Sequence, residues 1–235
     1  GGGTDQTNVL GHFADSMVPL HGYKYLRDLR ADHMYWKDDT RTQNGAIYCG
    51  PGIFYDTTSQ RIHVRLAHTS LKGLGDDNYR GETDPRKVPL VIAGINSGPT
   101  LLLKNAKNVR IQDLVIRGAR THAVDVIDGR NIELDGLTIY GGQSAIHVKD
   151  SWGLRVAHTA CRGIAAPWTF RGSLKYRAIE ARIFSASGWT PTGRDNRDFE
   201  IAYSEFTDCV DGIFLGNVKN VRFHHNLVDN ISDDG

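Results

Sequence analysis

Apolar residues recur along the second half of the chain at a spacing of 22 or 23 residues. Six segments share one pattern, and their first residues are Val109, Ile132, Leu154, Tyr176, Phe199 and Val221. The pattern has four positions in each segment: the first residue and those two, five and seven residues later. All of them are apolar except the position five residues later, which is polar in three segments, at Thr159, Ser204 and Asn226. Alternation with period two at each pair predicts two short strands separated by a bend, with these side chains on one face.

A second apolar pair follows later in most segments and predicts a third strand in each repeat. These pairs are Val124 and Val126, Ile146 and Val148, Trp168 and Phe170, and Ile213 and Leu215. Three short strands in about 22 residues are typical of one coil of a right-handed parallel β-helix, an all-β solenoid. A leucine-rich repeat is disfavoured, because the sequence shows neither its Leu-x-x-Leu-x-Leu frame nor a helix-forming segment in each unit.

Asparagine precedes the first predicted strand in three of the repeats, at Asn108, Asn131 and Asn220. An Asn residue tolerates the left-handed backbone conformation, and its side chain can hydrogen-bond to the equivalent turn of the next coil. We therefore expect these residues to have a structural role.

The first part of the chain lacks this periodicity. We expect residues 1–87 to form an irregular N-terminal region, in which a hairpin with strands at 46–56 and 60–66 and a long charged loop cap the open end of the helix. Residues 88–235 are expected to form the coils, as one continuous domain with the region before them. The sequence stops within a coil, so we expect the solenoid to be truncated at its C-terminus.

Charge and composition exclude several classes of protein. The formal net charge of +1 argues against nucleic acid or an anionic membrane as a partner. No apolar run approaches the roughly 18 residues that a membrane span requires. The three cysteines have no metal-ligand spacing, and no metal site is expected from them. The first residues lack a secretion signal, so a secreted or periplasmic protein would have lost it.

Acidic residues gather near the end of the sequence. Asp233 and Asp234 follow Asp211 by 22 and 23 residues, so they should lie above it on the adjacent coil. Equivalent positions on stacked strands are about 4.8 Å apart. Clustered carboxylates cannot all ionise readily, and one can remain protonated as a general acid while its neighbours stay charged. Glycoside hydrolysis requires this division of roles.

Asp-Gly-Ile at residues 211–213, followed one coil later by Asp-Asp, resembles the polygalacturonase family of glycoside hydrolases in the pectin-lyase-like superfamily. The resemblance in fold covers residues 88–235, and the resemblance in catalytic residues covers about 25 residues. It implies that Asp233 protonates the leaving oxygen while Asp211 and Asp234 activate water.

The sequence departs from that family at several positions. Cys209 and Val210 stand where the family has Asn-Thr, and Gly235 stands where it usually has Cys. The Gly-His-Gly and Arg-Ile-Lys motifs of the family would lie beyond residue 235. Asp and Gly also form the turns that lead into many β-helix strands, so a purely structural role for the aspartates is the alternative.

A column of polar residues lies four positions into the coils, and its members are His158, Glu180, Tyr203 and His225, with His224 beside them. Outward residues on stacked strands form a surface stripe, in which His and Glu could bind substrate, supply an acid and a base, or hold a metal. A solvated polar face with incidental histidines is the alternative.

A further column on the third strand places Asp125 beside His147 and Thr169, with Lys149 and Arg171 at the next outward position, two residues further. Basic residues stacked in this way could bind a sugar carboxylate, although surface ion pairs are the alternative. Polysaccharide lyases of the superfamily use Lys or Arg as a base, with Ca²⁺ or another cation on the uronate. The resemblance therefore implies Ca²⁺ only for a lyase, and otherwise no cofactor is expected.

These patterns favour a bacterial, secreted or periplasmic β-helix protein that acts on an extended polysaccharide, by glycoside hydrolysis through the three aspartates. A polysaccharide lyase or epimerase is one alternative. A non-catalytic carbohydrate-binding or surface protein is the other. Polysaccharide is the expected partner, and the sequence gives no indication of the oligomeric state.

Overall fold

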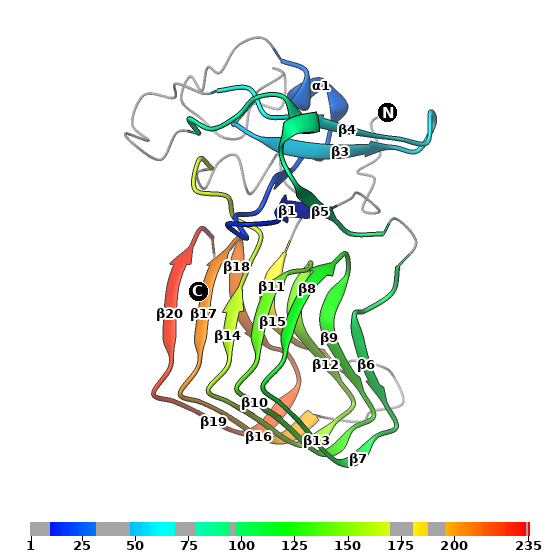
Figure 1. Ribbon diagram of the computed structural model, residues 1–235. Coiled ribbons are helices and arrows are strands. Elements are labelled where there is room, and N and C mark those ends of the chain that lie inside the picture. The colour runs from blue at the N-terminus through cyan, green and yellow to red at the C-terminus, as the bar shows by residue number, and fades with distance from the viewer. Residues whose placement is uncertain are drawn as a thin grey trace.

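The computed structural model describes residues 10–31, 48–68, 79–94, 97–169, 181–187, 196–233 and 235. Three five-stranded sheets wind around one elongated core, and a smaller N-terminal region lies over one side of it (Figure 1). In each of the three sheets, all neighbouring strands are parallel. The predicted all-β parallel β-helix is therefore confirmed.

Successive coils contribute one strand to each sheet. Sheet 1 contains β7 (Lys107–Gln112), β10 (Arg130–Asp135), β13 (Trp152–Ala157), β16 (Asn196–Ala202) and β19 (Val218–His224). Sheet 2 contains β8 (Val115–Ala119), β11 (Thr138–Gly141), β14 (Ala160–Arg162), β17 (Glu205–Cys209) and β20 (Leu227–Ile231). Sheet 3 contains β6 (Leu101–Lys104), β9 (His122–Ile127), β12 (Ser144–Lys149), β15 (Arg182–Ser187) and β18 (Asp211–Leu215).

The predicted apolar columns form the core of the middle coils, whereas Leu114, Phe223 and Val228 of the two end coils are exposed. Ile132, Leu134, Ile139 and Ile146 are each at most 1 % exposed, and Cys161, seven residues after Leu154, is fully buried. Because the side chains alternate along each strand, the residues between these positions are turned away from the core. The outer faces of the sheets are therefore available for other roles.

The coil predicted to begin at Tyr176 is not a separate rung of sheet 1. Strand β13 pairs directly with β16, so that Arg155 lies opposite Glu200. The third strand of this longer coil is β15, in which Phe184 and Ala186 are buried. They occupy the inward positions that were predicted for Trp168 and Phe170. Tyr176 and Phe170 themselves lie outside the described residues.

Trp168 belongs instead to a loop that joins the solenoid to the N-terminal region. Its indole Nε1 donates a hydrogen bond to the carbonyl oxygen of Pro51 at 3.0 Å, and its ring lies 6.3 Å from that of Phe13. An apolar residue at the expected spacing thus packs against a different core. The longer coil thus contains an insertion between β14 and β15, which we call the excursion, and Trp168 in this insertion attaches it to the N-terminal region.

The left-handed conformation and the stacking predicted for these asparagines are confirmed, but each residue lies near the start of a strand of sheet 1 and not in a turn before it. Asn108 and Asn131 have φ angles of 53° and 52°, and Asn131 Nδ2 donates to Asn108 Oδ1 at 2.9 Å. Asn220 Nδ2 donates to Asp198 Oδ1 at the corresponding position of its strand, at 3.0 Å. Each bend in the strand therefore places a side-chain amide where it can bond to the neighbouring coil.

The N-terminal region contains short elements in two small sheets. Its elements are β1 (Gly11–Phe13), β2 (His21–Gly22), α1 (Leu26–Leu29), β3 (Gly52–Asp56), β4 (Arg61–Arg65), a 3₁₀ turn at Pro85–Lys87 and β5 (Leu90–Ile92). The predicted hairpin is present as the antiparallel pair β3 and β4, β2 adds to β3, and β1 pairs with β5.

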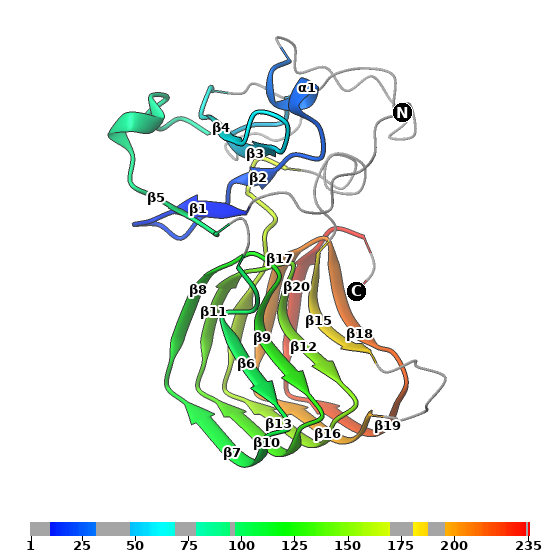
Figure 2. The same ribbon diagram turned by 90° about the vertical axis from the view of Figure 1, so that its right-hand side faces the viewer.

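The described elements of this region lie above the connections from sheet 2 to sheet 3 in both views (Figures 1 and 2). The contact of Trp168 with Pro51 explains this position, because the excursion leaves the solenoid at its side. No helix in the described part of the chain is long and apolar enough to cross a membrane.

Candidate active site

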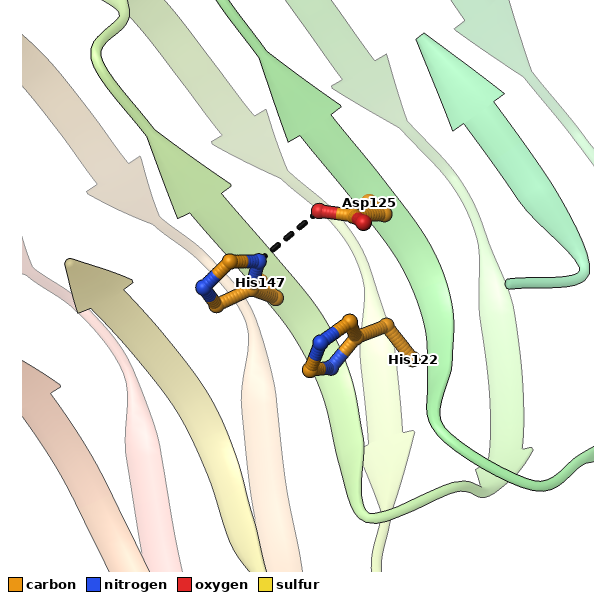
Figure 3. A group of neighbouring side chains, drawn as sticks. All are labelled: His122, Asp125 and His147. Atoms are coloured by element: carbon orange, nitrogen blue, oxygen red, sulfur yellow. Dashed lines mark hydrogen bonds and ion pairs between the residues drawn. The ribbon is translucent and has the colours of Figure 1, made fainter. Parts of the chain in front are cut away.

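A chain of hydrogen bonds crosses three neighbouring strands of sheet 3. The Nδ1 atom of His147, on β12, lies 2.8 Å from Asp125 Oδ1 on β9. The Nε2 atom of the same ring lies 2.8 Å from Ser187 Oγ, at the end of β15. Figure 3 shows Asp125 and His147 facing each other across the two strands, with His122 beside them. The three bonded residues are therefore contributed by three different strands.

Strand alternation explains how these side chains come together. Val124 and Val126 are fully buried in the core, so Asp125 between them is turned to the outer face of the sheet. The parallel register then places His147 opposite Asp125. Asp125 is 7 % exposed, and the side chain of His147 is 16 % exposed. The pair is thus shielded from water but remains accessible from one side.

The partners of His147 determine which ring nitrogen carries the proton. An ionised carboxylate only accepts hydrogen bonds, so Asp125 holds the proton on Nδ1. In the neutral ring Nε2 is then an acceptor, and it accepts a hydrogen bond from the hydroxyl of Ser187. This arrangement leaves a basic nitrogen directed at a hydroxyl group.

The ring of His122 packs against the ring of His147. Their centroids are 4.3 Å apart and the planes differ by 16°. Burial, and secondly the proximity of His147, lowers the pKa of His122 below its ordinary value. Its Nδ1 atom is buried and has no hydrogen-bond partner among the described residues. His122 is therefore neutral at pH 7 and adds no positive charge beside His147.

His122, Asp125 and His147 also form a donor set for a metal ion. One ligand atom from each lies within 4.8 Å of the others, and two imidazoles with a carboxylate suit zinc or a similar transition metal. However, the lone pair of an imidazole nitrogen lies in the plane of its ring. The two rings are nearly parallel, so they cannot both direct a nitrogen at one ion unless a ring rotates. The observed geometry is therefore better suited to proton transfer.

Lys149 lies at the edge of this group. The register places it opposite Ser187 on the neighbouring strand, two residues along β12 from His147. It makes no ion pair with any residue that the structure describes. A free ammonium group beside the serine can interact with an anionic group of a ligand.

The family model for a right-handed β-helix region matches residues 100–235, more than half of the chain. The chain belongs to the right-handed β-helix family. The comparisons with curated proteins and with solved structures found no match.

In this right-handed β-helix, the third-strand column holds some of the residues predicted for it. Asp125 and His147 are brought together, whereas Thr169 lies in the excursion, where its hydroxyl donates to the carbonyl oxygen of Ala166 at 2.5 Å. Ser185 takes the place opposite His147 that was predicted for Thr169. Arg171 lies outside the described residues.

The predicted aspartate site is described in part. Asp211 is the first residue of β18, and its Oδ2 atom lies 3.6 Å from Arg182 Nε. The backbone N–H of Asp233 donates to the carbonyl oxygen of Val210 at 2.8 Å. This bond places Asp233 beside residue 210 on the adjacent coil, next to Asp211. Asp234 lies outside the described residues.

The predicted column four residues into the coils forms an aromatic stack. The rings of His158 and Tyr203 are 5.6 Å apart, and those of Tyr203 and His225 are 4.8 Å apart. Their φ angles of 48°, 53° and 55° place all three in the turn between sheets 1 and 2. His224 contacts Glu200, with Nε2 3.4 Å from Oε1. Glu180 lies outside the described residues.

Sheet 1 carries a ladder of alternating charges on its outer face. Positive and negative residues alternate from strand to strand in the order Arg110, Glu133, Arg155, Glu200 and Arg222. Successive pairs approach within 3.6 Å or less. Because each charge has opposite neighbours, this face resembles a solvated structural surface rather than a binding site.

A cavity of about 410 Å³ lies between the turn at residues 16–19 and the ends of the sheet 2 strands. Tyr140, Arg162 and Asp208 line it. The guanidinium of Arg162 is already compensated, because its nitrogens lie 3.3 Å from Glu205 and 3.8 Å from Asp208. The cavity therefore offers polar groups without a net charge.

The sequence pattern missed two members of the group on sheet 3. Ser187 follows His147 by 40 residues because of the excursion, so a period of 22 does not align them. His122 lies at the start of β9, outside the predicted columns. Its position three residues before Asp125 is the only sequence signal that connects it to the site.

Proposed function

We propose that this right-handed β-helix protein is a carbohydrate-active enzyme, in which His147 is the general base of a site on the outer face of sheet 3. One observation carries the proposal: a histidine whose Nδ1 is held by a shielded carboxylate and whose Nε2 accepts a proton donor. A base of this kind needs a fixed tautomer and access from one side, and both conditions are met here.

The shape of the protein supports a polymeric substrate. Parallel coils repeat equivalent outward positions along the solenoid, so successive units of an extended polysaccharide can meet successive strands. Lys149 provides a positive charge next to the base, which suits an acidic or acylated sugar. The fold alone does not determine the reaction, and we infer catalysis from the contact between Asp125 and His147.

Two reactions on polysaccharides use such a base. His147 can remove the proton next to a uronate carboxylate, as a lyase or epimerase requires, or it can activate a hydroxyl group or a water molecule. In both cases Asp125 stabilises the imidazolium that forms. Removal of the imidazole should therefore abolish either reaction.

Glycoside hydrolysis by Asp211, Asp233 and Asp234 is the second candidate. The backbone hydrogen bond of Asp233 to Val210 favours it, because it brings two of the three aspartates to adjacent coils. The ion pair with Arg182 suits Asp211 to the charged role of activating water. This site would lie on the same sheet as His147, nearer its C-terminal strand.

An assay of products separates these candidates. The protein is incubated with a panel of acidic, neutral and acetylated polysaccharides, and reducing ends, unsaturated uronate absorbance and released acid are recorded. The variants are His147→Gln and Asp211→Asn, and the matched control is His63→Gln on β4 of the N-terminal region. We expect His147→Gln to lower the rate by about 10²-fold or more, with His63→Gln unchanged.

Two other outcomes would favour a different function for the protein. New reducing ends that persist in His147→Gln but vanish in Asp211→Asn would overturn the base proposal and favour the hydrolase. Binding of a polysaccharide without any product would favour the non-catalytic protein. All variants should retain the circular dichroism spectrum of the unmutated chain, since each replaced side chain lies outside the apolar core.

A further inference from the structure

We propose that Ser187 is a nucleophile activated by His147, and that the site removes ester substituents, such as acetyl groups, from a polysaccharide. The choice of a polysaccharide rests on the proposed function above. The nucleophile itself rests on the hydrogen bonds of sheet 3.

The order of the hydrogen-bonded atoms is that of a nucleophilic serine site. A carboxylate oxygen contacts Nδ1, and a serine hydroxyl contacts Nε2, each at 2.8 Å. Nucleophilic serine sites use this same order, in which the carboxylate orients the ring and the ring accepts the hydroxyl proton. The basic nitrogen of His147 is thus already occupied by a hydroxyl group, which makes Ser187 the first proton donor available to it.

Two serines on β15 differ in their contacts with His147. Ser185 is the register partner of His147, but it is 8 % exposed and its hydroxyl makes no hydrogen bond within the described part of the chain. Ser187 lies two residues further, at the last position of β15, and is partly exposed. The ring of His147 therefore bonds to the more accessible serine rather than to the serine directly opposite it.

Neighbouring residues complete the site. Lys149 lies opposite Ser187 in the register, so its ammonium group can stabilise the negative oxygen that develops on the ester carbonyl. The ring of His122 covers one face of His147 and limits its rotation. Asn196 Nδ2 donates to the backbone oxygen of Ser187 at 2.8 Å and fixes the end of the strand.

The reaction balances without an additional cofactor. Ser187 Oγ forms a bond to the ester carbonyl carbon while its proton moves to His147 Nε2. The bond between that carbon and the sugar oxygen then breaks, and the sugar oxygen takes the proton from Nε2. Water attacks the acyl carbon while Nε2 accepts its proton, the bond between that carbon and Oγ breaks, and Oγ takes the proton from Nε2. The released acid leaves Ser187 and the neutral ring of His147 restored.

Two measurements on the purified chain test the nucleophile. The first is hydrolysis of p-nitrophenyl acetate, and the second is labelling with a biotinylated fluorophosphonate, with the labelled peptide identified by mass spectrometry. We expect the label on Ser187 and a rate that falls by about 10³-fold in Ser187→Ala and in His147→Gln. Ser185→Ala, the control on the same strand, should keep both the label and the rate.

A label on Ser185, no serine labelled, or an unchanged rate in Ser187→Ala would overturn the inference. The Ser187→Ala variant keeps the backbone oxygen that Asn196 contacts, so loss of activity through misfolding is not expected. Circular dichroism and a thermal transition equal to those of the unmutated chain verify this. Ser187→Cys, labelled by iodoacetamide faster than free cysteine, gives a second test of activation by His147.

Acetylated xylan, with release of acetate as the readout, separates the inference from the proposed function. Ester hydrolysis that depends on Ser187, without binding of any polysaccharide, would support the nucleophile and overturn the carbohydrate substrate. Modification of a polysaccharide that needs His147 but proceeds fully in Ser187→Ala would overturn the inference alone.

Discussion

The solenoid and the N-terminal region satisfy the hydrogen-bonding groups of their bends and loops in different ways. In the solenoid, a residue at a bend bonds to its counterpart on the next coil, as Asn131 does to Asn108. In the N-terminal region a single side chain serves several backbone groups: the hydroxyl of Tyr23 donates to the oxygen of Gly50 and accepts from the N–H groups of Cys49 and Gly50. Repetition distributes the contacts of the solenoid over many coils, whereas the N-terminal region depends on a few unique residues.

This difference also indicates where function can reside. Positions that repeat along the solenoid are constrained by their neighbours, as in the charge ladder of sheet 1. Asp125, His147 and Ser187 are not copies of one another, and they meet at the coil that carries the excursion. The candidate site thus lies where the repeat is interrupted.

The largest effect on stability is expected in the core of the solenoid. Phe206 is fully buried, and its ring lies 6.4 Å from Phe184 and 6.3 Å from Phe223. Phe206→Ala should lower the free energy of unfolding by about 3 to 5 kcal/mol through lost burial and the cavity that remains. Denaturation in urea measures this loss of stability. The control is Tyr203→Ala, which should lower the free energy of unfolding far less because the ring of Tyr203 is half exposed. Equal losses for the two would contradict the assigned core.

The next largest loss of stability is expected when the hydroxyl of Tyr23 is removed from the N-terminal region. Tyr23→Phe leaves two buried N–H groups and one carbonyl without their partner, and should cost about 2 to 4 kcal/mol. Tyr140→Phe is the matched control, because its hydroxyl makes no hydrogen bond within the described residues. Urea denaturation of both variants makes the comparison, and a Tyr23 variant as stable as the control would argue against this network.

His21 should make the N-terminal region sensitive to acid. Burial lowers its pKa from 6.5 to about 3, and neither ring nitrogen has a hydrogen-bond partner among the described residues. Below pH 6.5 the unfolded chain binds a proton that the folded chain does not, so this contribution to stability is lost as the pH falls from 6.5 towards 3. At about pH 4.5 the loss should be about 2 to 3 kcal/mol. His21→Leu should lack this part of the pH dependence in urea titrations, whatever its stability at neutral pH.

A smaller effect is expected at the repeated bends of sheet 1. Asn131 has a φ angle of 52° and bonds to Asn108, so Asn131→Ala should cost about 1 to 2 kcal/mol through strain and the lost bond. Asn131→Gly should cost less, because glycine accepts this conformation, as Gly153 does in the next coil at a φ of 69°. Thermal unfolding would rank the two variants, and the reverse order would contradict this account of the bend.

Much of the fold could be predicted because a solenoid core imposes its period on the sequence. The columns that contain Ile132 and Ile139 had to be apolar in every coil, and the stacked asparagines follow from backbone conformation. The coil at Tyr176 was predicted wrongly for a physical reason. Trp168 has a suitable spacing and polarity, but it packs against the N-terminal region, and a linear pattern cannot distinguish one core from another.

The same excursion limited the prediction of the site. Asp125 and His147 are 22 residues apart, so one period was enough to place them side by side. Ser187 lies 40 residues beyond His147, and its alignment requires the length of the excursion to be known. The stacking of His122 depends on ring orientation, which no periodicity encodes.

The central claim is that Asp125 fixes His147 with a basic Nε2 directed at Ser187. Nitrogen-detected NMR of the imidazole rings at neutral pH tests it most directly, with assignments from His147→Gln. The account predicts that His147 carries its proton on Nδ1, with that proton strongly deshielded, and that Asp125→Asn abolishes this signal. A proton on Nε2, or a tautomer that is unchanged in Asp125→Asn, would contradict the account.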